Sequence, residues 1–68
     1  MFNTGDKVVM ATNTSGTIPV GAKGVVQDMD EGGVYTIIVD FGDTLSRQGH
    51  RIGRGWRMAE RELEHDYS

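Results

Sequence analysis

The sequence predicts an all-β domain in which five short strands close into a small barrel. Ten glycines and one proline are spread evenly along the 68 residues. Short runs of β-branched residues lie between these turn-forming positions, which is typical of all-β barrels and sandwiches. A chain of this length has room for one small core, so we expect residues 1–68 to form a single domain.

Two strands are expected in the first half of the chain. The first covers residues 6–12, DKVVMAT, and places Val8 and Met10 on one face. The turn-rich segment 13–21 follows, and its Pro19 lacks the N–H that a central strand would use. The second strand covers residues 22–30, with Gly24 at a bend or a bulge.

The clearest strand pattern is the alternation in residues 34–41, VYTIIVDF. Before it, residues 30–33, DEGG, predict a tight hairpin connection, because glycine adopts the positive φ that such turns need. The alternation directs Tyr35 and every second residue up to Phe41 toward the core, and Val34, Thr36 and Ile38 outward.

The last quarter of the chain is expected to complete the sheet. A long polar loop, residues 42–55, precedes a short strand at 56–59, in which Trp56 and Met58 point the same way. Residues 60–66 are expected to form a turn and then a last strand with Leu63 inward. The predicted core is Val8, Met10, Val20, Val25, Tyr35, Ile37, Val39, Phe41, Met58 and Leu63.

Two stretches resemble SH3-like small barrels. In residues 5–30, a Gly-Asp pair opens the first strand and a G-x-x-G-x-V pattern, from Gly21 to Val26, begins the second. YTIIVDFGD and ERELE are similar to the second half of such barrels, which include KOW-type domains, the small photosystem I accessory subunit and the nitrile hydratase β-subunit barrel. The resemblance implies a five-stranded SH3-like barrel with a long Arg/Gly-rich loop before the fourth strand. KOW relatives often contact RNA, but this chain is acidic overall, unlike the ribosomal members.

The positive charge of the chain is concentrated in one segment. The formal net charge is −3, yet residues 47–58 contain four arginines and no acidic residue. Arginine offers forked donors for carboxylates and phosphates, and tryptophan often anchors interfaces. The predicted binding residues are therefore Arg47, His50, Arg51, Arg54, Trp56 and Arg57. The alternatives are that Trp56 packs in the core and that the arginines only pair with neighbouring carboxylates.

Catalysis has no clear signature in the sequence. Asp40 and Asp43 could form an acid/base pair, although carboxylates at a strand–loop junction more often cap turns and offset neighbouring arginines. The chain contains no cysteine, and its two histidines lack metal-ligand spacing. We therefore expect a protein that is not an enzyme and has no metal and no cofactor.

The leading interpretation is a small non-catalytic protein-binding module: an accessory subunit, regulator or inhibitor that docks on a larger partner through the Arg/Gly/Trp loop. The alternative is a KOW-like RNA- or DNA-binding barrel that uses the same arginines on phosphates and Trp56 for stacking. The net charge of −3 argues against non-specific nucleic-acid binding, which depends on accumulated positive charge.

The sequence also bears on where the protein is located and on whether it associates with copies of itself. The sequence shows no signal peptide and no apolar run of membrane-spanning length, so we expect a cytoplasmic protein without a membrane partner. A homo-oligomer is compatible with Val34 and Ile38 on one outward face, because neighbouring apolar residues there hint at a covered surface.

Overall fold

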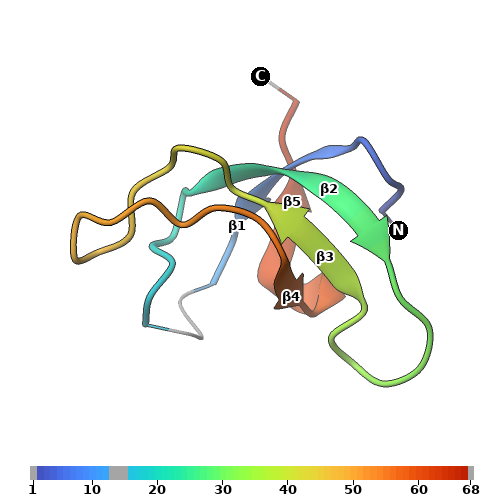
Figure 1. Cartoon of the computed structure of the whole chain (residues 1–68). Helices are drawn as coiled ribbons and strands as arrows, with labels where there is room; N and C mark the ends of the chain where they lie inside the picture. Colours follow the sequence, from blue (N-terminus) through green and yellow to red (C-terminus); the bar gives the residue numbers. More distant parts are fainter. Residues whose placement is uncertain (1, 13–15, 68) are drawn as a thin grey trace.

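A computed structural model, which describes residues 2–12 and 16–67, shows one antiparallel sheet of five strands in the order β4-β3-β2-β1-β5 (Figure 1). The elements are β1 Lys7–Met10, β2 Lys23–Met29, β3 Ile37–Asp40, β4 Trp56–Met58, the 3-10 turn η1 Glu60–Glu62 and β5 Leu63–His65. The expected all-β class is confirmed. Strands β4 and β5 form the two edges of this sheet, and no pairing within the described ranges joins them.

Several element boundaries agree with the sequence pattern. The turn and last strand expected in 60–66 are η1 and β5, and the short strand at Trp56 is β4. The hairpin expected between the second and third strands is present, because β2 and β3 are antiparallel neighbours, but its connection is longer than the tight turn expected at 30–33. Asp30 N–H donates to the carbonyl of Thr36 at 2.7 Å, so a longer connection precedes β3, which begins at Ile37. Residues 13–15 of the turn-rich segment lie outside the described residues.

The core lies on the inward face of this sheet. Seven of the ten predicted core residues are buried, whereas Val20, Val25 and Tyr35 are 55%, 42% and 52% exposed. The prediction for Val25 is wrong because Val26 is the residue that pairs with the buried Val39. Since successive side chains of a strand point to opposite faces, Val25 points outward. The prediction for Tyr35 is wrong because this residue lies in the connection before β3, where the alternation of the strand does not yet apply. Val20 lies in a turn. Other residues fill the interior instead: Phe2, Ile18, Ala22, Val26, Ile52 and Ala59.

A bulge in β2 lies three residues beyond the position that the sequence suggested. The register with β3 shifts between Val26 and Asp28, so Gln27 is the extra residue. Gly24 has a different role, because a Cβ there would lie 2.8 Å from Val39 Cγ1 and 2.9 Å from the carbonyl oxygen of Asp40. Glycine at this position lets β2 approach β3 closely.

Helical structure in the described part of the chain is limited to the three-residue turn η1. None of it is long and apolar enough to cross a membrane.

Candidate binding hairpin

Residues 41–55, which join β3 to β4, form an irregular hairpin that extends beyond the sheet (Figure 1). We call this segment the arginine hairpin. Its arms are joined by the antiparallel bridge between Leu45 and Arg51. Backbone N–H groups also donate across it: Phe41 to Gly53 at 2.8 Å, Ile52 to Thr44 at 2.9 Å and Ser46 to His50 at 2.7 Å. The segment predicted as a polar loop is therefore internally paired.

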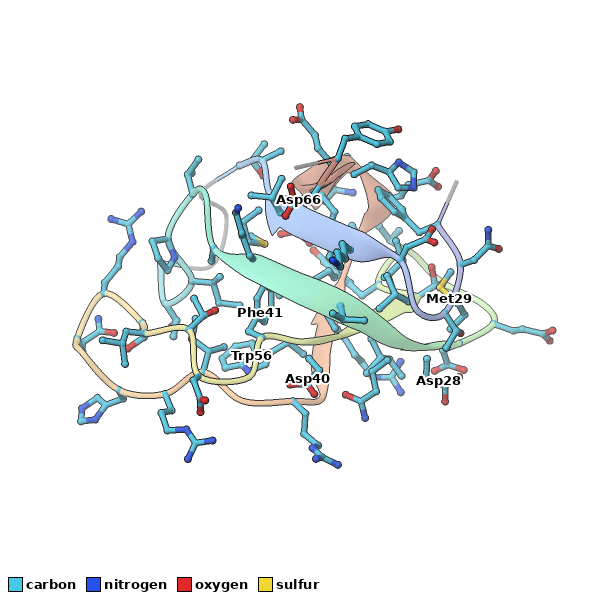
Figure 2. All side chains as sticks on the ribbon, turned by 90° about the horizontal axis from the view of Figure 1, so that it is seen from above. Asp28, Met29, Asp40, Phe41, Trp56 and Asp66 are labelled. Carbon is cyan, nitrogen blue, oxygen red and sulfur yellow. The ribbon has the colours of Figure 1, made fainter. Side chains whose placement is uncertain are left out.

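Two inward residues hold the base of the arginine hairpin against the sheet. Ile52 is buried in the core, and the half-buried Trp56 packs against the same cluster. The indole Nε1–H of Trp56 donates to the carbonyl of Ile52 at 2.9 Å. Figure 2 shows Trp56 and Phe41 close to the point at which the hairpin leaves the sheet. In this position Trp56 links the hairpin to the core.

Two further contacts tie the arginine hairpin to the first half of the chain. The Thr44 hydroxyl donates to the carbonyl of Lys23 at 3.1 Å, at the start of β2. Arg47 N–H donates to the carbonyl of Thr17 at 3.3 Å, in the connection between β1 and β2. The hairpin and this connection therefore lie side by side, which limits how far the hairpin can move.

The structure separates the six predicted binding residues into two groups. Arg47, His50, Arg51 and Arg54 are exposed on the arginine hairpin, while Trp56 and Arg57 lie on β4. Arg57 Nη1 is 2.6 Å from Asp30 Oδ2, so it serves the connection between β2 and β3. The hydrogen bond from Arg57, with a second from Glu31 N–H and the Arg57 charge, lowers the pKa of Asp30 below its usual 3.8.

The remaining arginines differ in how they are paired. Arg51 Nη2 is 2.6 Å from Asp43 Oδ1, an ion pair with both side chains exposed. For Arg47 and Arg54, no carboxylate partner is found among residues 2–12 and 16–67. With three arginines and one aspartate, the hairpin is a cationic surface on an acidic protein.

The two carboxylates considered for acid/base catalysis have other contacts. Asp40 Oδ1 accepts from Gly42 N–H at 2.8 Å and thereby caps the turn that begins the hairpin. Asp43 pairs with Arg51. Within the described ranges, no group of three histidine, aspartate or glutamate side chains could hold a metal ion.

Sequence reasoning missed two residues of the arginine hairpin. Leu45 is an exposed large apolar side chain, and it lies directly opposite Arg51, so the two share a face. Ile52 is the buried anchor. The signal was present, because Leu45 and Ile52 are the apolar residues in the polar run 42–55. Only the pairing of the arms decides that one points outward and the other inward.

Comparison with protein-family models, with curated proteins and with solved structures found no match. The resemblance to SH3-like barrels therefore depends on the sequence motifs alone.

Proposed function

We propose that this protein is a small, non-catalytic binding module that docks on a larger protein partner through the arginine hairpin. The observation that carries the proposal is the exposed face of the hairpin, where Leu45 lies opposite Arg51 and further arginines flank the pair. An exposed apolar side chain among forked cationic donors suits an acidic protein surface that also offers an apolar contact.

A protein partner is favoured over nucleic acid by two features of the hairpin. Trp56 directs its N–H to Ile52 and packs against the core, which leaves little of its ring for stacking on a base. Asp43 neutralises one of the three arginines, and the whole chain is acidic, so the charge available for phosphates is small. Nucleic-acid binding is therefore the alternative outcome of the test.

We also propose that the sheet belongs to the SH3-like barrel class. Support comes from β1, which pairs with both β2 and β5, so that the first strand adjoins the last. Further support comes from η1, which links β4 directly to β5 and so brings the chain from one edge strand to the other. A barrel of this kind would remove the exposed edges that a sheet of short strands otherwise has.

Affinity capture from the native host's lysate, with and without nuclease, tests the docking proposal. We expect a stoichiometric protein that survives nuclease, and we expect the Arg47→Ala/Arg54→Ala double variant and Leu45→Ala each to weaken its capture about tenfold or more. Arg61→Ala is the matched control, because Arg61 lies off the hairpin, 6.0 Å from the ring centroid of Tyr35. Its capture should equal that of the wild type.

Two results would contradict the docking proposal. Capture that disappears after nuclease treatment would favour the nucleic-acid alternative, with the arginines on phosphates. Capture that both hairpin variants retain would show that the partner binds elsewhere on the molecule. Circular dichroism of each variant separates a lost contact from a lost fold.

A further inference from the structure

A second surface, away from the arginine hairpin, has the opposite chemistry. It is a hollow beside β5, an edge strand of the sheet. Its lining combines aromatic, aliphatic and acidic side chains: Phe2, Glu60, Leu63, Glu64, His65 and Tyr67. None of these residues belongs to the hairpin, so a ligand of the hollow is independent of docking through the hairpin.

Three rings form a ladder along this hollow. The ring centroids of Phe2 and His65 are 4.4 Å apart, and those of His65 and Tyr67 are 5.7 Å apart, with planes tilted by 35° and 31°. Tyr67 is the outermost ring and is 90% exposed. Exposed aromatic faces attract cations, because the π face carries the negative part of the ring quadrupole.

Carboxylates in the same lining set the sign of the ligand charge. Glu64 is exposed and lies in the strand between His65 and Leu63, and Glu60 lines the hollow from η1. His65 Nε2 is 3.4 Å from Asp6 Oδ2, so a carboxylate also faces the middle ring of the ladder. Negative potential and the exposed ring of Tyr67 together favour a cation and repel phosphates and acidic peptides.

We propose that this hollow binds an arginine or lysine side chain of a basic segment of a protein partner. The hollow is an open surface depression beside an edge strand, so it can take the tip of a long side chain whose backbone stays outside. Enclosed pockets that cover most of their ligand are the usual sites of small molecules. Charge complementarity between the hollow and such a segment identifies the occupant.

The test is an NMR titration of the full-length protein with short capped peptides, Gly-Arg-Gly and Gly-Lys-Gly. We expect amide shifts confined to residues 60–67 and weak, saturable binding. Tyr67→Ala and Glu64→Gln should each weaken that binding about threefold, the size of an exposed cation–π or ion-pair contact. Tyr35→Ala is the matched control, an exposed tyrosine on another connection, and should bind as the wild type does.

Four outcomes would overturn the proposal. A peptide with citrulline in place of arginine that binds equally well would show that charge has no part. Binding that Tyr67→Ala leaves unchanged would remove the ring ladder from the site. Tetramethylammonium that binds as tightly as the peptides would make the occupant a small cation. Shifts in residues 60–67 that grow with protein concentration alone would make it a second copy of this chain.

Discussion

At the scale of single residues, Gly24 shows how the absence of a side chain allows two strands to pack closely. Its pairing partner in β1 is the buried Val8. On the side where other residues carry a Cβ, Gly24 lies directly against Val39 and the backbone of Asp40. Most other glycines of the chain serve turns through positive φ, whereas Gly24 is needed because nothing larger than hydrogen fits. The close packing of β2 against β3 at this point therefore requires a glycine.

Replacing this glycine should destabilise the fold. In Gly24→Ala the added Cβ would lie 2.8 Å from Val39 Cγ1 and 2.9 Å from the backbone oxygen of Asp40. We expect the free energy of unfolding to fall by about 1–3 kcal/mol, as for other overpacked core positions. Urea unfolding measures it, with Val25→Ala at the adjacent outward position as control, expected to change stability by less than about 1 kcal/mol. Equal losses in both variants would contradict the close-approach argument.

At the scale of elements, the connection between β2 and β3 is held to β4 by one exposed ion pair. Arg57 lies opposite Ile38 on the outward face of the sheet and reaches Asp30 at the end of β2. The pair lowers the pKa of Asp30. A carboxyl with a lowered pKa stabilises the fold above its ordinary value of 3.8, and this contribution is lost as pH falls through the lower folded value.

This pairing predicts a titration shift. In Arg57→Ala the pKa of Asp30 should rise toward 3.8, because its strongest hydrogen-bond donor is removed. Carbon-detected NMR of the side-chain carboxyl across pH 2–6 measures the shift. Arg51→Ala, which removes an exposed ion pair on the arginine hairpin, should leave Asp30 unchanged. An unshifted Asp30 in Arg57→Ala would show that the pair does not persist in solution.

At the scale of the whole molecule, a small core holds together a sheet of short strands. The radius of gyration is 10.8 Å, close to the ~11 Å of a compact domain of this length. A core of this size leaves only a few kcal/mol of net stability. Single core residues therefore contribute a large fraction of the total.

Two methionines that flank Ile37 test this dependence on the core. Met29 on β2 and Met58 on β4 both pair with Ile37, but Met29 is 37% exposed and Met58 only 3%. Met58→Ala should lower stability by about 2–5 kcal/mol, enough to unfold much of the protein, while Met29→Ala should change it by less than about 1 kcal/mol. Thermal unfolding followed by circular dichroism distinguishes them. Similar melting temperatures in both variants would contradict the assigned burial.

The sequence by itself determined the all-β class and the inward positions of β1, β3, β4 and β5. Turn-forming glycines and the two-residue alternation are local signals, and local signals survive without tertiary information. Val8, Met10, Ile37, Val39, Met58 and Leu63 were predicted to be buried for this reason, and they are.

Only the tertiary structure decided the register and the use of the arginines. Val25 is exposed because its neighbour Val26 is the residue that pairs with the buried Val39, and Tyr35 is exposed because it lies in the longer connection before Ile37. Arg57 was grouped with its sequence neighbours, but it pairs with Asp30, 27 positions away. Such pairings depend on which strands become neighbours, and side-chain period alone contains no information about that.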